Sequence, residues 1–166
     1  MGSYSGLLKQ MILQMKRDMD EPLGFHLGRL LGSRLLHSGV LENVDILVPV
    51  PIHWRRLLKR GFHAAHVIAE GVSSLSQPKV RNLVRCRRLT KKQGKLTGNN
   101  RFKNVKDSFA LKPLTNVADA HVLIVDDVMT SGATLNEMAK TLLQAGAAEV
   151  KTAVVGRATG NNPVTF

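Results

Sequence analysis

The sequence contains little cysteine and few aromatic residues. Among its 166 residues one is a cysteine, Cys86, and 4% are aromatic. A lone thiol cannot form an internal disulfide, and it cannot supply a cysteine-based zinc ribbon or metal cluster. The sequence therefore predicts a protein of a reducing compartment, the cytoplasm, and it shows no metal site built from side chains alone.

Long apolar runs and acidic residues are also scarce. Asp45, His53 and Asp126 interrupt the longest apolar stretches, and a membrane-spanning helix needs roughly 18 to 20 apolar residues. No membrane span is predicted.

Lys and Arg total 24 against 12 Asp and Glu, giving a net charge of +12, which favours a polyanionic partner. The 43% of hydrophobic residues is enough to form a core, and the length suits a single domain over residues 1–166.

The order of predicted elements indicates an α/β fold. Apolar residues at helical spacing predict a helical amino-terminal segment at 1–37 and further helices at 61–74 and 133–143. Runs rich in β-branched residues predict strands at 44–51, 80–84, 121–125 and 150–155, and residues 109–111 are predicted to form a further short strand. Strands that alternate with helices predict a three-layer fold, in which helices cover both faces of a parallel sheet and functional loops follow the strands.

Residues 87–108 are predicted to form a mobile loop, because they contain few large apolar side chains. Between Lys79 and Lys106 lie eleven lysines and arginines and no acidic residue. One interpretation is a solvated loop kept in water by its charge. Another is a flexible basic hood that closes over an anionic ligand and neutralises a departing group through Arg101 or Lys95. A third is a set of phosphate contacts to nucleic acid.

Residues 122–134 carry the clearest chemical signal. An apolar strand ends in Asp126 and Asp127 and turns through Gly132 into a helix. The free amides and hydroxyl groups at the start of that helix form a cradle for an anion. The two carboxylates would repel a free phosphate, so the ligand needs hydrogen-bond donors beside its phosphate. A ribose diol that carries a 5′-phosphate meets both requirements.

Other motifs that bind phosphate or contain paired carboxylates fit this sequence less well. A helix cap explains one aspartate, whereas the second would be desolvated without a partner. The Gly-x-x-x-x-Gly-Lys-Ser/Thr and Gly-x-Gly-x-x-Gly patterns are both missing from the sequence. A receiver domain needs a phosphoacceptor aspartate downstream, and no aspartate follows Asp127.

Residues 122–134 resemble the phosphoribosyl pyrophosphate (PRPP) motif of type I phosphoribosyltransferases. The match consists of the apolar strand, the acidic pair and Thr130-Ser131-Gly132-x-Thr134. Over about residues 4–158 the chain resembles the ComF family of competence-associated proteins. The segments that carry this wider resemblance are Pro49-Val50-Pro51, Arg60-Gly61-Phe62, Arg88-x-Thr90-x-x-Gln93-x-x-Leu96, Arg101, Asn104-Val105 and Ser108-Phe109.

The resemblance implies a three-layer parallel sheet of the type I phosphoribosyltransferase type and a set of site residues. Asp126 and Asp127 would bind the ribose hydroxyl groups, and with Arg101 they are the expected catalytic residues. The loop at Pro51 and Ile52, together with Arg60, would bind the pyrophosphate. The 5′-phosphate would lie on Thr130, Ser131, Gly132, Ala133 and Thr134, and Val128 and Met129 before them are also expected to bind the substrate.

The implied activity is transfer of a phosphoribosyl group from PRPP, bound with Mg²⁺, to an unidentified nitrogen acceptor. The alternative is a non-catalytic PRPP-binding or DNA-uptake accessory protein, with DNA or DNA-uptake proteins as partners. Proteins of this fold often form homodimers, so a homodimer is a further expectation.

The sequence departs from the ComF pattern in two places. Family members commonly carry a four-cysteine zinc-binding segment at the amino terminus, which this sequence does not contain. Where the family usually has Asn-Gln after Arg-Gly-Phe, this chain has His63-Ala64. Any role of that amide pair is therefore not expected in this protein.

Overall fold

A five-stranded sheet forms the centre of the molecule. The computed structural model describes residues 2–88 and 98–158. The strand order is β1-β7-β6-β2-β3, and every pair of neighbours is parallel. The strands are β1 (Gly2–Ser3), β2 (Ile46–Pro49), β3 (Lys79–Val80), β6 (His121–Met129) and β7 (Glu149–Arg157). The predicted α/β fold with a parallel sheet is therefore confirmed.

The central strands are buried on both faces. Leu47 and Leu123 pack into one hydrophobic core, whereas their neighbours Val48 and Ile124 pack into the other. Successive side chains of a strand point to opposite faces, so a strand covered on both sides must be apolar throughout. This is why β2 and the first part of β6 appear in the sequence as continuous apolar runs.

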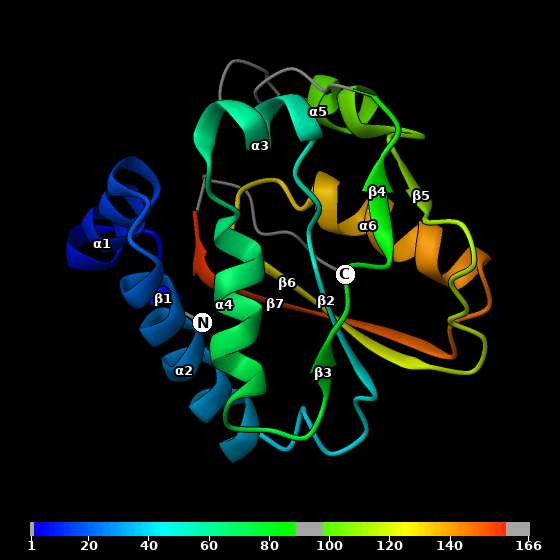
Figure 1. The fold of residues 1–166 in the computed structure, drawn as a ribbon, viewed down its shortest axis with the longest axis horizontal. Coiled ribbons are helices and arrows are strands. Elements are labelled where there is room, and N and C mark those ends of the chain that lie inside the picture. The colour runs from blue at the N-terminus through cyan, green and yellow to red at the C-terminus, as the bar shows by residue number, and fades with distance from the viewer. Residues whose placement is uncertain (1, 89–97, 159–166) are drawn as a thin grey trace.

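One face of the sheet is covered by three helices, α1 (Gly6–Asp18), α2 (Glu21–His37) and α4 (Ala64–Ser73), seen beside the strands in Figure 1. The first two are the helices expected in residues 1–37. Helices α2 and α4 touch through glycines, because a Cβ atom at Gly28 would clash with the carbonyl oxygen of Ile68, and one at Gly71 with that of Phe25. This close contact fixes the amino-terminal helices against the domain.

The other face carries helix α6 (Ala133–Gln144) and a small antiparallel sheet of β4 (Val84–Cys86) and β5 (Phe109–Leu111). Figure 1 shows these elements on the side opposite α1, α2 and α4. The predicted three-layer arrangement is confirmed. The strand expected at 80–84 is in fact divided, since β3 belongs to the central sheet and β4 to the small one.

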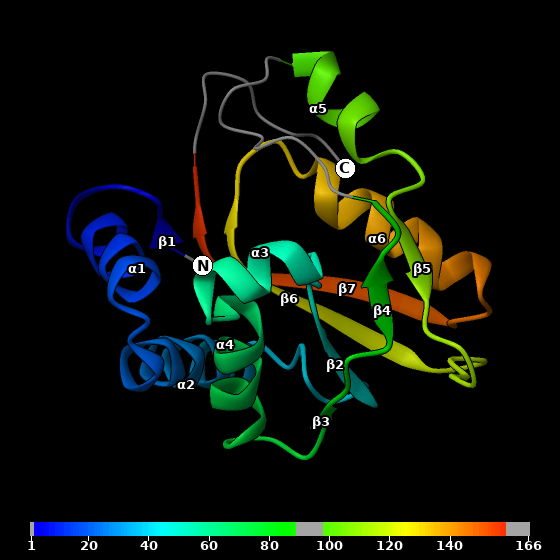
Figure 2. The ribbon, with the colours of Figure 1, turned by 45° about the horizontal axis from the view of Figure 1, so that its top comes forward.

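Helices α3 (Trp54–Arg60) and α5 (Gly98–Val105) lie beyond the carboxyl ends of the central strands, both at the top of Figure 1, and α5 again at the top of Figure 2. Residues 98–105 belong to the segment that was expected to be a loop. Within it Val105 is only 3% exposed, and α5 packs against α6, so this part of the segment has enough apolar contact to form a helix. Residues 89–97 of the same segment lie outside the described residues.

Strand β6 is longer than the sequence predicted. Its pairing with β7 continues beyond Asp126 to Val128 and Met129, which lie opposite Gly156 and Arg157. The acidic pair is therefore part of a paired strand and does not follow its end. No helix in the described part of the chain is long and apolar enough to cross a membrane.

Candidate functional site

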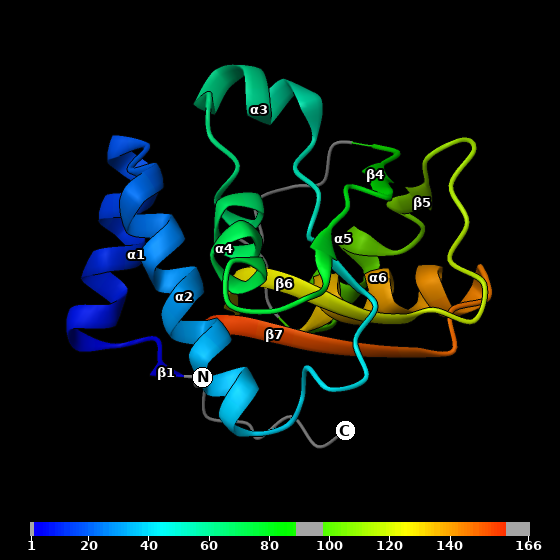
Figure 3. The same ribbon diagram turned by 60° about the horizontal axis from the view of Figure 1, so that its bottom comes forward.

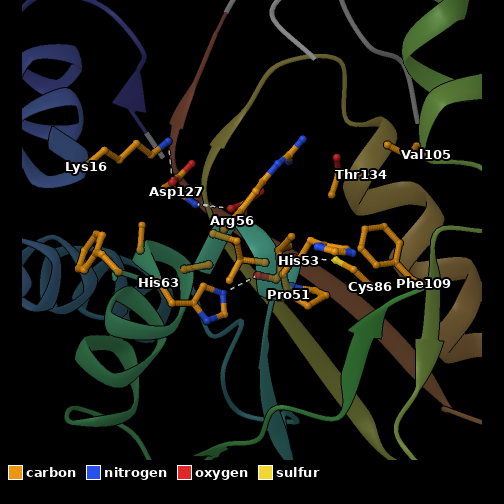
Figure 4. A pocket seen from close by; sticks show the side chains of 16 residues that line it. Lys16, Pro51, His53, Arg56, His63, Cys86, Val105, Phe109, Asp127 and Thr134 are labelled. Carbon is orange, nitrogen blue, oxygen red and sulfur yellow. Dashed lines mark hydrogen bonds and ion pairs between the residues drawn. The ribbon is translucent and has the colours of Figure 1, made fainter. Parts of the chain in front are cut away.

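A cavity of about 310 Å³ opens where β2 and β6 end. Its walls come from both layers of helices, from the loop after β2 and from the small sheet (Figure 4). The residues that line it are Lys16, Val50, Pro51, Ile52, His53, Arg56, Phe62, His63, Ala64, Ala65, Cys86, Val105, Phe109, Asp126, Asp127 and Thr134. Ligands of parallel α/β proteins bind at this edge of the sheet.

The two aspartates point in different directions. Neighbouring residues of a strand face opposite sides of the sheet. Asp127 faces α1, where its Oδ2 lies 2.7 Å from Nζ of Lys16. Asp126 faces the start of α6, and its Oδ1 accepts a hydrogen bond of 2.9 Å from the backbone N–H of Asp127. The pair therefore offers carboxylate oxygens to two regions of one cavity.

The pKa of Asp126 is raised from its ordinary value of 3.8 to about 8. Desolvation is the main cause, because burial disfavours the charged carboxylate, and the negative charge of Asp127 adds to it. The hydrogen bond from the Asp127 N–H and the positive charge of Lys16 act in the opposite direction. A buried carboxylate with this perturbed pKa in a cavity is typical of a functional site.

The turn between β6 and α6 forms a second, smaller cavity of about 70 Å³. Gly132 has φ +74°, and it precedes the first residue of α6. The backbone N–H of Ala133 donates to the Ser131 hydroxyl at 3.4 Å. The lining residues are Asp126, Val128, Met129, Thr130, Gly132, Thr134 and Leu135. Asp126 and Thr134 line both cavities, so the start of helix α6 adjoins the acidic pair.

The loop after β2 forms the opposite wall and is held by two side chains. His63 donates from Nε2 to the carbonyl oxygen of Val50 at 2.9 Å, since a carbonyl can only accept. The Cys86 thiol donates to the carbonyl oxygen of Pro51 at 3.3 Å. Burial lowers the pKa of His63 and raises that of Cys86 to about 11. Burial therefore favours the neutral imidazole of His63 and the protonated thiol of Cys86.

The structure brings many of the predicted site residues together. Pro51, Ile52, Asp126, Asp127 and Thr134 line the larger cavity, whereas the smaller one holds Val128, Met129, Thr130 and Gly132. Ser131 and Ala133 complete the turn without lining either cavity. Arg60 ends α3 and Arg101 lies in α5, but their side chains are outside the described part of the structure.

Several residues of the larger cavity were not predicted to be site residues. Lys16 lines it from α1, Arg56 from α3, and His63 from the position just before α4. Arg56 follows the strand end in the sequence, where Arg60 was the residue predicted to bind the pyrophosphate. Lys16 lies 110 residues before Asp126, on a helix whose apolar spacing indicates only that it packs on the core. No local sequence signal identifies Lys16 as a site residue.

Among the described residues, no group of three or more His, Cys, Asp or Glu side chains could hold a metal ion. Mg²⁺ commonly binds through one or two carboxylates and the phosphate oxygens of a substrate. The acidic pair supplies carboxylates of this kind beside the turn into α6.

Residues 58–161 match the phosphoribosyl transferase domain family. The chain is 33% identical over 136 residues to competence protein F of Haemophilus influenzae, covering 76% of this chain and 59% of the relative. It is 34% identical over 152 residues to the DNA utilization protein YhgH of Escherichia coli, covering 89% of this chain and 66% of the relative. The chain thus spans about three fifths to two thirds of the length of these relatives.

The fold also matches a solved enzyme structure. The hypoxanthine phosphoribosyltransferase of Trypanosoma cruzi gives a TM-score of 0.53 at 16% identity, covering 88% of this chain and 73% of the enzyme. At 16% identity this similarity establishes a shared fold and nothing more about this chain. The family match and the curated relatives confirm the resemblance that the acidic pair and its turn suggested, and the chain belongs to the phosphoribosyltransferase domain family, with competence protein F among its relatives.

Proposed function

We propose that the protein binds PRPP with Mg²⁺ and transfers its phosphoribosyl group to a nitrogen acceptor. The observation that carries this proposal is the junction of the two cavities, where Asp126 and Thr134 belong to both. A ligand with a phosphate at one end and a diol beside it matches that junction, because the turn donates hydrogen bonds and the carboxylates accept them.

Each part of PRPP has a counterpart in the proposed complex. The 5′-phosphate lies on the turn at residues 128–134, and the ribose hydroxyl groups donate to Asp126 and Asp127. The pyrophosphate lies against the loop at Pro51 and Ile52, near Arg56, which lines the same cavity. Helix α5, which contains Arg101 and contributes Val105 to the wall of the cavity, is the element that we assign to cover the ligand.

The residues present fit a magnesium ion that enters with the substrate, since the carboxylate pair adjoins the expected phosphate positions. When bound, the ion would neutralise part of the charge of the leaving pyrophosphate. In the reaction the bond from C1 of the ribose to the pyrophosphate oxygen breaks, with its electron pair leaving on the oxygen. A bond from C1 to the acceptor nitrogen forms, and the nitrogen gives its proton to Asp127.

Isothermal titration calorimetry with PRPP and Mg²⁺ tests the binding step. We expect the double substitution Asp126→Asn and Asp127→Asn to weaken PRPP at least about 100-fold, because the carboxyl groups that accept from the ribose hydroxyl groups are lost. The matched control removes two acidic charges at exposed positions, Asp18→Asn and Glu149→Gln, and should bind like the wild type. Equal affinity of the double variant and the wild type would refute the assignment of the diol.

Pyrophosphate release from PRPP tests the transfer step. The protein, with Mg²⁺, is offered purines, pyrimidines, ammonia and glutamine in turn, and an acceptor that stimulates release identifies the reaction.

The names of the relatives, which refer to competence and DNA utilization, favour a second candidate function, a PRPP-binding accessory protein in DNA uptake. Clear PRPP binding without release in the presence of any acceptor would support that second function.

A further inference from the structure

A second groove lies beside the cavity of the acidic pair. It encloses about 440 Å³, and its own walls come from α3 and β4. Figure 3 shows α3 standing away from α4 and the sheet, with β4 near the segment that leads into it. The lining residues are Pro51, Ile52, His53, Trp54, Leu57, His63, Asn82, Val84, Arg85, Cys86, Arg87 and Lys112. The loop at residues 51–53 thus separates the two spaces and belongs to both.

The charge of this groove is positive. Arg85, Arg87 and Lys112 line it and are exposed, and its lining contains no acidic side chain. Within residues 2–88 and 98–158, none of these three cations has a carboxylate partner within 4.0 Å. Three cations without a carboxylate partner in that part of the chain favour an anionic group, and arginine pairs with phosphate oxygens through two parallel hydrogen bonds.

The same groove has an aromatic wall. Trp54 is 58% exposed, although a tryptophan ring is highly buried in most proteins. Its ring stacks on His53 with centroids 5.7 Å apart and an interplanar angle of 27°. Leu57, one turn further along α3, is 39% exposed. Arg55 lies over the same ring, with its Cζ 5.2 Å from the ring centroid, so the indole already contacts one positive charge. An exposed tryptophan in a groove lined by further cations offers a surface for an aromatic group next to positive charge.

We infer that this groove is a second ligand site, and that it binds a mononucleotide with its base against Trp54 and His53 and its phosphate on Arg85, Arg87 and Lys112. The groove volume lies within the roughly 300 to 1,000 Å³ of small-molecule sites. The cations lie on β4 and beside β5, whereas the aromatic rings lie at the start of α3. A ligand with an aromatic part and an anionic part therefore spans the groove.

The inference goes beyond PRPP binding and does not depend on it. Arg85, Arg87, Lys112 and Trp54 line the groove and are absent from the lining of the cavity that holds the acidic pair. Conversely, Asp126, Asp127 and Thr134 are absent from the groove. Substitutions can therefore remove one site and leave the other.

The test uses the fluorescence of Trp54, which is the only tryptophan in the sequence. The probe is adenosine 3′-monophosphate, which has a base and a phosphate but lacks both a 5′-phosphate and a free diol. We expect saturable quenching, because the base stacks on the indole ring. Arg85→Gln with Arg87→Gln should weaken the probe about tenfold or more, whereas Asp126→Asn with Asp127→Asn should leave its affinity unchanged.

A matched control separates a specific site from general attraction to a basic protein. Lys9→Gln with Arg29→Gln removes two positive charges from exposed positions on α1 and α2, outside the groove. This variant should bind the probe like the wild type. In calorimetry Trp54→Leu should also weaken the probe, which supplies a measurement independent of fluorescence.

Four outcomes would overturn the inference. One is the absence of quenching, and another is an equal loss of affinity in the control variant. A third is loss of binding in the double aspartate variant, which would move the probe to the other cavity. The fourth is binding only by oligothymidylate, with affinity that rises with its length, which would make the groove a track for a nucleic-acid strand.

Discussion

The two sides of the proposed PRPP site are built in different ways. The side that would hold the 5′-phosphate and the diol is one continuous segment, from Asp126 to Thr134, at the junction of β6 and α6. The opposite side is assembled from α1, the loop after β2, α3, α4 and β4. One side depends on local backbone conformation, whereas the other depends on the packing of segments that are distant in the sequence.

Substitutions on the two sides should therefore differ in how strongly they weaken PRPP binding. A change in the continuous segment should remove ligand contacts even where the rest of the fold is intact. A change in the assembled side should have a smaller effect, because its lining is divided among several segments. Three experiments measure this difference, in order of decreasing expected effect.

The largest effect is expected at the turn. Gly132 has φ +74°, which a β-branched residue adopts only with strain of roughly 1–2 kcal/mol. Gly132→Val should reorient the amides at the start of α6 and weaken PRPP about 100-fold in calorimetry. Gly39→Val, at φ +69° and far from the site, is the matched control. It should lose a similar amount of stability and keep its affinity, and a similar loss of affinity in both would contradict a local role of the turn.

The second effect concerns the acidic pair in the absence of ligand. The pKa of Asp126 is raised to about 8, so between about pH 4 and pH 8 the folded protein keeps a proton that the unfolded chain releases. The free energy of unfolding should therefore fall as the pH rises through this range.

Urea denaturation at pH 5 and at pH 8 measures this dependence. In Asp126→Asn the decrease between the two pH values should be smaller than in the wild type by at least about 1.4 kcal/mol, the equivalent of one pKa unit. Glu42→Gln, at an exposed position, should retain the wild-type decrease. An unchanged decrease in Asp126→Asn would show that this carboxyl group ionises normally.

The smallest effect is expected on the assembled side. Lys16 places a positive charge 2.7 Å from Asp127, at a position that is partly exposed. Lys16→Met should weaken the anionic PRPP about fivefold, which corresponds to about 1 kcal/mol, and Lys16→Arg should restore most of the affinity. Lys9→Met is the control on the same helix. Tighter binding by Lys16→Met would mean that the ion pair competes with the ribose for Asp127.

The sequence allowed the continuous side to be predicted in detail. An apolar strand, two carboxylates, hydroxyl groups and a glycine follow one another, and each residue type has a local physical reason to be there. The length of β6 was underestimated, because its pairing with Gly156 and Arg157 of β7 is a tertiary property. The helix at residues 98–105 was missed for a similar reason, since burial of Val105 depends on contacts that its own segment does not show.

The assembled side could be predicted only in part. The prolines after β2 marked its loop, but the hydrogen bonds from His63 and Cys86 that hold this loop join residues 13 and 35 positions away. Hydrophobic patterning does not indicate which polar side chain of a helix will reach a cavity. Lys16 and His63 therefore became visible as site residues only in the folded chain.

The three-residue segment from Pro51 to His53 lines both the cavity of the acidic pair and the neighbouring groove. A ligand in one of them that displaces this segment also changes the shape of the other. Thermodynamic linkage then requires the influence to be mutual, so that whatever factor a nucleotide imposes on the dissociation constant of PRPP, PRPP imposes on that of the nucleotide.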